Sequence, residues 1–543
     1  MSYICSIYFL KKYPLFMKIN LNRTRLKRPN FYLKELWNSS FFVFFAFANY
    51  FLPFFMCLMA GITKSGYSIQ YVFIIGMASG FLVNFLQIGS ILCMTLSFGK
   101  LIYKHEEGFK SVSNNEIFTF QLITVLFLSV ILMPIYFGIT YMFLHFIGGY
   151  KNTLNIVSGF GLDFLGTTTP SVLLMTLNTF FIYKIFFDKN KNWKSVLLIF
   201  INLIINSFFV FIFGYYVTQL SMYSYGVGLI VGNLISLIVN LVFICSENIP
   251  MKLQFTIKMM PYIKTLGKVW NLALVSIYGT ILRSIILMIV SLSLKVNTLY
   301  NMWNYMMATI LWYHTFYLLL FVNGGLTQQI SYLKVKNCEN RAEYYTDALK
   351  FAWVLPLFAI LSSTSLVLAY NWLMGPIASV YISNYDPSLL EGPKQLTHAF
   401  VYGKGSITSF MREPYSKAYV FTGIFVVFVT LSTSLGSVVP FKLRKSTKED
   451  VISMISGLIV ESAVLAFIIG FGVGVKIPSL PYMQVYCLAL LITGIVFLVL
   501  KGLGVLGSVK KIKKLWNEES CLTTGACKRP YTWNIEVNNT KTK

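Results

Sequence analysis

Long apolar stretches separated by short polar connections cover most of this 543-residue chain. Twelve such stretches, each of roughly 20–30 residues, are long enough to cross about 30 Å of hydrocarbon. They predict membrane spans at residues 37–60, 69–96, 117–145, 159–183, 195–217, 225–246, 269–294, 302–326, 351–373, 419–440, 451–474 and 484–506. The pattern therefore predicts an all-α polytopic membrane protein whose connecting segments alternate between the two sides of the membrane.

The basic residues divide unevenly between these two sides. With the N-terminus inside, 36 of the 45 lysine and arginine residues lie in, or at the ends of, the inside segments, and 8 lie in the outside segments. Basic residues are retained on the cytoplasmic side of membrane proteins, so the asymmetry supports both the number of spans and their orientation. We expect a multi-pass protein of the cell (plasma) membrane with both termini in the cytoplasm.

Composition removes several classes of function. The chain is 56% hydrophobic and 12% charged, which excludes a soluble multi-domain protein. The net charge of +26 sits mostly in short loops next to helix ends, where it favours anionic membrane lipids rather than nucleic acid. The chain has no phosphate-binding loop of the Walker type, no metal-ligand cluster and no nucleophile with a base. We expect no enzyme activity and no cofactor, apart from a transported H⁺ or Na⁺, and a monomer.

A weak internal repeat divides the chain into two halves. Leu33–Asn38 opens the first span and the similar Leu266–Asn271 opens the seventh, while Ser97–Lys100 and Ser331–Lys334 follow the second and eighth spans. Both matches have almost the same offset at equivalent points of the topology. They predict two six-helix bundles related by a pseudo-two-fold axis along the membrane normal. The predicted units are a basic N-terminal segment, two bundles joined by a linker, a long outside loop within the second bundle and a basic tail: 1–36, 37–246, 247–268, 269–506, 374–418 and 507–543.

Glycines and prolines inside the spans carry a further expectation. Close packing is expected around the sixth span, which holds Gly226, Gly228 and Gly232. Kinks or local unwinding are expected at the prolines within spans, which are Pro53, Pro134, Pro170 and Pro356.

Three segments of the first half carry a family resemblance. Thr176–Phe180, the apolar run Ile201–Phe213 with Asn206 at its centre, and the small-residue segment Tyr225–Asn233 resemble helices 4 to 6 of the multidrug and toxic compound extrusion (MATE) family. Gly324–Arg341 resembles the segment after helix 8 of that family. The superfamily also contains oligosaccharide-lipid flippases. The resemblance implies twelve helices in two bundles and ion-coupled export of an amphiphilic organic substrate.

Two departures limit what the resemblance carries over. Bacterial members commonly have an acidic residue in helix 1, but the stretch 41–60 has none. The acidic residue that often follows the helix 5 asparagine is also missing, with Val210 nearby. The resemblance therefore does not carry cation coupling over to the N-terminal bundle.

Away from the inner ends of the spans, three charged residues lie within them, and these are Asp163, Arg283 and Glu461. Charges inside a membrane are costly and usually mark ion or substrate pathways. Glu461 is the candidate for ion coupling; alternatively it forms a structural ion pair with Arg283. Arg283 could instead contact an anionic substrate group, whereas Asp163 is close enough to the outer end of its span to reach water.

Two polar residues complete the set of candidate site residues. His314 lies at a depth similar to that of Arg283 and Glu461, and could either take part in the site or be satisfied by the helix backbone. A shift of 255 residues places Asn206-Ser207 on Glu461-Ser462, so an amide and an acid occupy equivalent positions in the two halves.

The favoured interpretation is a MATE-like secondary transporter for a small amphiphilic substrate. A flippase for a lipid-linked saccharide or another anionic lipid is the alternative, because Arg283 in a cavity suits an anion. A membrane scaffold without transport activity is the third. A cavity lined by acidic or neutral aromatic groups would favour export of cations, a basic cavity would favour lipid flipping, and a packed interior would favour the scaffold.

Overall fold

The computed structural model describes residues 31–63, 68–107, 112–147, 154–189, 192–217, 222–256, 258–267 and 354–369, with isolated residues and pairs of residues between 322 and 499. Within these residues the chain is almost entirely helical. Most of the second predicted bundle lies outside them, so twelve helices in two bundles stays a prediction.

Six long helices follow one another in the N-terminal part. They are α3 (Phe31–Ile62), α4 (Ser68–Glu107), α5 (Asn114–Ile147), α6 (Leu154–Lys189), α7 (Asn192–Tyr216) and α8 (Tyr223–Ser246). Each contains a stretch that is long and apolar enough to cross a membrane. The first six predicted spans are therefore confirmed as helices, and the chain is a multi-pass membrane protein.

Contacts between helix ends fix the relative directions of these helices. Lys194 in the first turn of α7 forms an ion pair with Glu247, which directly follows α8. At the opposite end, Thr63 after α3 is hydrogen-bonded to Tyr225 near the start of α8. We call the end that holds Glu247 the linker end, and the end that holds Thr63 the far end. The alternating directions agree with the alternating connections predicted from the sequence.

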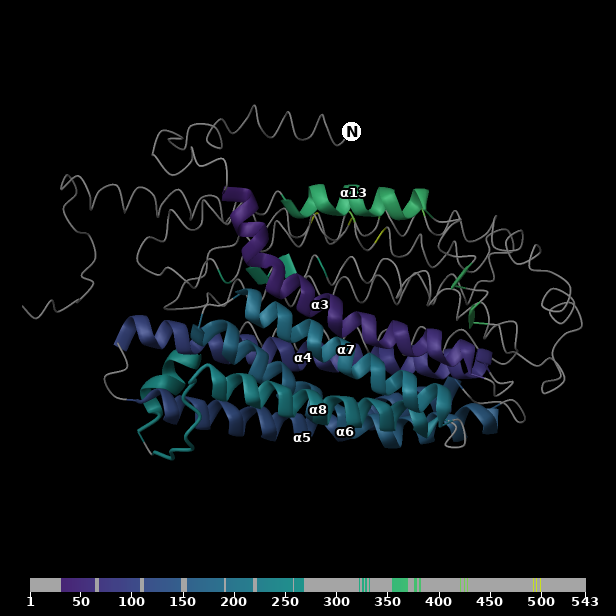
Figure 1. Cartoon of the computed structure of the whole chain (residues 1–543), viewed down its shortest axis with the longest axis horizontal. Coiled ribbons are helices and arrows are strands. Elements are labelled where there is room, and N and C mark those ends of the chain that lie inside the picture. Colours follow the sequence, from purple (N-terminus) through teal and green to yellow (C-terminus); the bar gives the residue numbers. More distant parts are fainter. Residues whose placement is uncertain are drawn as a thin grey trace, which may run out of the picture.

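Figure 1 shows α4 to α8 gathered along one common direction, with α3 crossing them obliquely. A shorter helix, α13 (Val354–Leu368), lies on the other side of α3 in this view. It falls within the predicted ninth span and contains Pro356 in its first turn.

The three glycines of α8 allow the close packing that the sequence predicts. A Cβ atom at Gly226 would lie 1.8 Å from the Thr167 hydroxyl of α6, and one at Gly228 would lie 2.7 Å from the Phe209 carbonyl oxygen of α7. A Cβ atom at Gly232, one turn further along α8, would lie 2.8 Å from Asn206 Oδ1 of α7. Any side chain at these positions would push neighbouring backbones apart, so the absence of Cβ atoms sets the distances between α8, α6 and α7.

Helices extend beyond the apolar stretches at the linker end. The predicted spans 159–183 and 195–217 leave residues 184–194 as a connection, but α6 continues to Lys189 and α7 begins at Asn192. Hydropathy detects the part of a helix that lies in hydrocarbon, whereas backbone hydrogen bonding continues through polar residues beyond it. The helices α3, α5 and α6 also continue through Pro53, Pro134 and Pro170, so these prolines do not interrupt them.

Aromatic side chains fill the core near the linker end. The ring of Phe41 stacks on Phe186 with centroids 3.9 Å apart, and it meets the edge of Tyr183 at 5.3 Å. Phe42 packs against Phe186 at 5.4 Å. These four side chains are at most 3% exposed, and they join α3 to the last turns of α6.

The segment after α8, residues 247–267, is packed onto the same bundle, and we call it the linker. Tyr262 reaches between α4 and α5, where its hydroxyl donates to the Leu96 carbonyl oxygen at 3.2 Å. The same hydroxyl accepts from Gln121 Nε2 at 3.0 Å. Burial raises the pKa of Tyr262 well above its ordinary range, so the phenol stays protonated.

Two further contacts fix the linker along its length. The backbone N–H of Gln254 donates to the hydroxyl of Thr119 on α5 at 2.9 Å. Leu266 lies over Gly99 of α4, where a Cβ atom would be 2.8 Å from its Cδ1. The linker is thus a strap across the linker end of α4 and α5.

Candidate functional site

A chain of five asparagines joins α6, α7 and α8 in the interior of the bundle. Asn240 Nδ2 donates to Asn178 Oδ1 at 2.8 Å, and Asn178 Nδ2 donates to Asn233 Oδ1 at 3.2 Å. Asn202 Nδ2 donates to Asn240 Oδ1 at 3.0 Å, while Asn206 Nδ2 donates to the backbone oxygen of Asn202 at 2.8 Å. All five side chains are at most 8% exposed. We call this set the amide chain.

The helical repeat brings these residues together. Asn202 and Asn206 are one turn apart on α7, and Asn233 and Asn240 are two turns apart on α8. Each pair therefore presents its amides to one side of its helix. Asn178 on α6 completes the set, because it contacts both amides of α8.

Two buried oxygens of the amide chain, Asn202 Oδ1 and Asn206 Oδ1, have no hydrogen-bond partner among the described residues, and neither has Ser207 Oγ, which follows Asn206 in α7. Asn206 also donates to Ser236 Oγ at 3.2 Å. The arrangement is uncharged. It can hold three helices together by hydrogen bonds, and the remaining oxygens can accept hydrogen bonds or contact a cation.

The other predicted site residues are not part of this chain. Asp163 lies on α6 at the far end, half-buried, with its carboxylate hydrogen-bonded to the exposed hydroxyl of Tyr223. Glu461, Arg283 and His314 lie outside the described residues, so their grouping stays a prediction.

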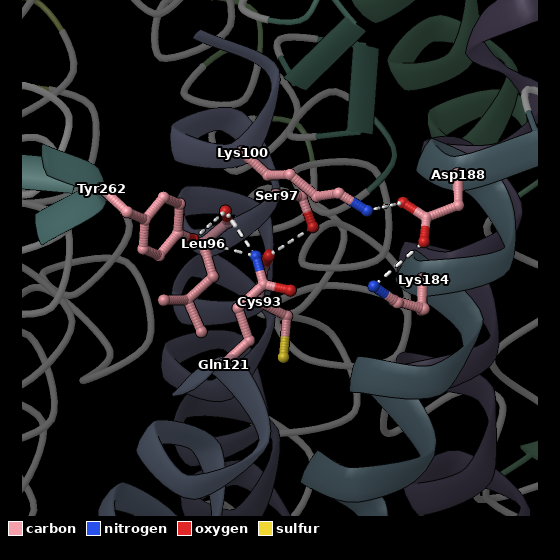
Figure 2. Close-up of polar contacts among 8 residues, drawn as sticks. All are labelled: Cys93, Leu96, Ser97, Lys100, Gln121, Lys184, Asp188 and Tyr262. Atoms are coloured by element: carbon pink, nitrogen blue, oxygen red, sulfur yellow. Dashed lines mark hydrogen bonds and ion pairs between the residues drawn. The ribbon is translucent and has the colours of Figure 1, made fainter. Parts of the chain in front are cut away.

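A cluster of charges lies between α4 and α6 at the linker end. Lys100 Nζ donates to Asp188 Oδ1 at 2.5 Å, and Lys184 Nζ lies 3.0 Å from Asp188 Oδ2. Figure 2 shows the three side chains pointing toward one another. The side chain of Lys184 is 3% exposed, and those of Lys100 and Asp188 are 12% and 11% exposed. We call these three residues the basic cluster, because one carboxylate faces two ammonium groups.

The groups drawn around the basic cluster bring no further charge. Gln121 donates to the backbone oxygen of Leu96, and Ser97 donates to that of Cys93 (Figure 2). The face of the Phe118 ring lies 5.1 Å from Lys184 Nζ, which adds a modest cation–π attraction.

A second ion pair at the linker end joins one lysine to one carboxylate. Lys194 of α7 meets Glu247 after α8, with the lysine side chain 28% exposed and the carboxylate side chain 9% exposed. It differs from the basic cluster in charge balance and in access to solvent.

The N-terminal part also contacts the C-terminal part of the chain at the linker end. Gln329 Nε2 donates to Glu35 Oε2 at 3.1 Å, and both residues are buried. A Cβ atom on Gly325 would lie 2.7 Å from the backbone oxygen of Phe42, so the two backbones touch. We call this set, together with Tyr332, the linker-end contact.

Tyr332 completes the linker-end contact. Its ring lies 6.1 Å from Phe42, 5.7 Å from Phe186 and 5.4 Å from Phe187 between centroids. Burial, with a smaller contribution from the Glu35 carboxylate, raises the pKa of Tyr332 to about 12. The phenol is therefore neutral at physiological pH and packs as an aromatic ring.

At the far end, α3 touches the C-terminal part a second time. A Cβ atom on Gly61 would lie 2.5 Å from the backbone oxygen of Val380 and 2.8 Å from Tyr381 Cα. Tyr381 is fully buried. Both ends of α3 are thus packed against segments that lie hundreds of residues later in the sequence.

Sequence reasoning found Asn206 but missed most of its surroundings. The amide partners come from three helices, and their pairing depends on packing. The basic cluster had a signal in the sequence, since Lys184 and Asp188 are four residues apart and so share a helix face. That signal was hidden because the predicted span ended at residue 183.

Comparison with known proteins identifies the fold. No protein-family model matches the chain, and no curated protein matches it in sequence. Several solved structures are similar, and three of them show the extent of the match. The first is a MOP superfamily transporter from Pyrococcus furiosus, with 12% identity over 86% of this chain and 95% of that one, at a TM-score of 0.58. The second is a multidrug resistance MATE family transporter in an outward-facing conformation. It has 11% identity over 88% of this chain and 96% of that one, at a TM-score of 0.58. The third is a MATE transporter of Vibrio cholerae in a bent form. It has 10% identity over 88% of this chain and 98% of that one, at a TM-score of 0.55. The resemblance seen in the sequence is confirmed at the level of structure: the chain has the fold of the MATE transporters of the MOP superfamily.

Proposed function

We propose that the chain is a secondary active transporter that moves an amphiphilic organic substrate across the cell membrane by ion-coupled alternating access. Its fold supports transport, because the similar structures are transporters and span nearly the whole chain. The excess of basic residues in the inside segments supports a linker end that faces the cytoplasm. We propose that it contacts membrane lipids and works as a monomer.

The observation that carries alternating access is the double contact of α3. Gly325 touches Phe42 at the linker end, and Tyr381 touches Gly61 at the far end. A carrier must be able to close on either side, and closure needs contacts between its two parts at both ends. Opening to the cytoplasm would break the linker-end contact, and opening to the outside would break the far-end contact.

Cross-linking tests this assignment directly. In a variant without the native cysteines, Glu35→Cys and Gln329→Cys should be joined by a short bifunctional thiol reagent. Transport into proteoliposomes should stop, and reduction of a cleavable cross-link should restore it. Unchanged transport by the fully cross-linked protein would refute the role of this contact.

Glu461 is the proposed coupling residue. Glu461→Gln should abolish gradient-driven transport while the protein still inserts and folds, because an ion-coupled carrier needs a group that changes charge or binds a cation. The measurement is uptake into proteoliposomes with imposed H⁺ or Na⁺ gradients. Asp163→Asn is the control, since that carboxylate lies at the far end beside exposed Tyr223.

A double variant separates coupling from a structural ion pair. If Glu461 and Arg283 only neutralise each other, removing one costs about 3–5 kcal/mol and neutralising both restores stability together with transport. Restored stability without gradient-driven transport would support coupling at Glu461.

The basic cluster favours a second candidate function, the transport of an anionic substrate such as a lipid with a charged headgroup. Lys100 and Lys184 leave one positive charge in surplus beside the linker-end contact. The Pyrococcus furiosus transporter is described as having a binding pocket of reversed polarity and, by suggestion, a different function. Comparing proteoliposome uptake of an organic cation with flipping of an anionic lipid would decide between the two.

A further inference from the structure

We propose that Lys100 and Lys184 form a binding site for a phosphate-bearing anion at the linker end. The proposal rests on the proposed function only in taking this end as the cytoplasmic mouth of the carrier. It concerns binding, so it can be tested without any transport measurement.

The first argument is the charge balance. Asp188 places one carboxylate oxygen against each lysine, and no other carboxylate is paired with either one among the described residues. A buried surplus charge is unfavourable unless something neutralises it, because the protein interior and the membrane both have a low dielectric constant. An anion with a full negative charge would neutralise the cluster.

The second argument is the unused hydrogen-bonding capacity of Lys184. Its ammonium group has three N–H donors. Its Nζ is buried, and although it lies 3.0 Å from Asp188, it has no hydrogen-bond partner of suitable geometry among the described residues. A phosphate group offers several acceptor oxygens at once, and lysine commonly binds phosphate.

The third argument is the location. Phe187 precedes Asp188 in α6 and contacts Tyr332 at 5.4 Å and Phe98 at 5.8 Å. Withdrawal of Tyr332, which opening of the linker-end contact requires, would uncover the turn of α6 that carries the basic cluster. The side chains of Lys100 and Asp188 are already slightly exposed. An anion arriving from the linker end would meet them before it reached the interior.

The ion pair of Lys194 and Glu247 supplies an internal control. It lies at the same end of the bundle, but there one lysine faces one carboxylate, and the lysine is 28% exposed. The proposal therefore predicts an anion effect at Lys184 and none at Lys194. A general attraction of anions to a basic surface would affect both.

The test uses the purified full-length chain. Binding of inorganic phosphate is measured in detergent from the rise in the unfolding temperature over a concentration series, against chloride at equal ionic strength. The native chain should be stabilised, and Lys184→Gln should bind phosphate about tenfold or more weakly, because a hydrogen bond to a charged group is lost. Lys184→Gln should fold, since it leaves the balanced pair Lys100–Asp188. Lys194→Gln should bind phosphate like the native chain.

A second arm identifies the source of the anion. The same variants are unfolded in lipid nanodiscs of phosphatidylcholine with and without phosphatidylglycerol. Stabilisation by inorganic phosphate in detergent indicates a soluble anion, and stabilisation by phosphatidylglycerol alone indicates a lipid headgroup. Either result supports the proposal if it depends on Lys184. If neither anion stabilises the native chain, or if Lys194→Gln lowers the effect as much as Lys184→Gln, the basic cluster is not an anion site.

Discussion

The amide chain and the basic cluster solve the same problem in different ways. Both bury polar side chains between packed helices at positions that are almost closed to solvent. The amide chain is neutral, and the amide oxygens of Asn178, Asn233 and Asn240 each accept a hydrogen bond from another member. The members of the basic cluster cannot satisfy one another in this way, because lysine only donates hydrogen bonds and one carboxylate faces two ammonium groups.

The difference teaches where function should be sought in this bundle. A network without net charge can hold helices together by hydrogen bonds alone. A buried network with a surplus positive charge is stabilised when it binds an anion. The following changes test this contrast, from the largest expected effect to the smallest.

Asp188→Asn should have the largest effect. It removes the only described carboxylate between Lys100 and Lys184, and leaving buried charges unpaired typically costs about 3–5 kcal/mol. Chemical unfolding in detergent should show the loss, and inorganic phosphate should restore part of it. Asp163→Asn is the matched control, and an equal loss there would contradict the special status of the basic cluster.

Gly232→Ala should come next. Its Cβ atom would lie 2.8 Å from Asn206 Oδ1 and 2.9 Å from Asn206 Cα, and a backbone atom cannot move aside cheaply. We expect a loss of about 1–3 kcal/mol of stability, as for other overpacked positions. Gly138→Ala in α5 is the control, because a Cβ atom there meets nothing within 4 Å. Equal stability of the two variants would show that α7 and α8 are packed less tightly than the distances at Gly232 indicate.

Asn240→Ala should have a smaller effect. It removes the hydrogen bonds to Asn178 and Asn202, and hydrogen bonds between helices in membranes contribute about 0.6 kcal/mol on average and at most about 1.7 kcal/mol. Combining it with Asn178→Ala in a double-mutant cycle measures their coupling. Strictly additive losses would mean that the two amides do not interact.

Lys194→Gln should have the smallest effect. The ion pair with Glu247 is partly open to solvent, and such pairs contribute about 0–1 kcal/mol. High salt should narrow the difference from the native chain further. A loss as large as that of Asp188→Asn would remove the distinction between balanced and unbalanced charges at the linker end.

Local features of the sequence predicted the helices but not their polar contacts. Hydropathy located the first six spans because each one must match the thickness of the membrane, and the glycines of α8 indicated close packing. Asn206 was found because its amide interrupts an apolar run. Its bond to the Asn202 backbone oxygen follows from the helix itself, since the two residues are one turn apart on α7. Its partner Ser236 lies on α8, and the hydropathy of α7 or α8 alone does not reveal it.

The ends of the helices and the linker were the least predictable parts. Lys184 looked like the start of a loop, although its partner Asp188 holds it inside α6. Residues 247–268 were expected to be a linker, but nothing in their composition predicted that Tyr262 would insert between α4 and α5. That contact depends on Gln121 and on the Leu96 carbonyl, which are more than a hundred residues away.

The strap formed by the linker has a consequence for the order in which the chain is synthesised. Tyr262 and Leu266 cover parts of α4 that would otherwise be bare, and both emerge from the ribosome before residue 269. The linker can therefore pack onto α4 and α5 while the rest of the protein is still being translated, whereas the contacts of α3 with Gly325 and Tyr381 must form later. A split version of the protein should accordingly be divided after Gly267 rather than after Ser246. The later cut keeps Tyr262 and Leu266 in the N-terminal fragment, where they pack against α4.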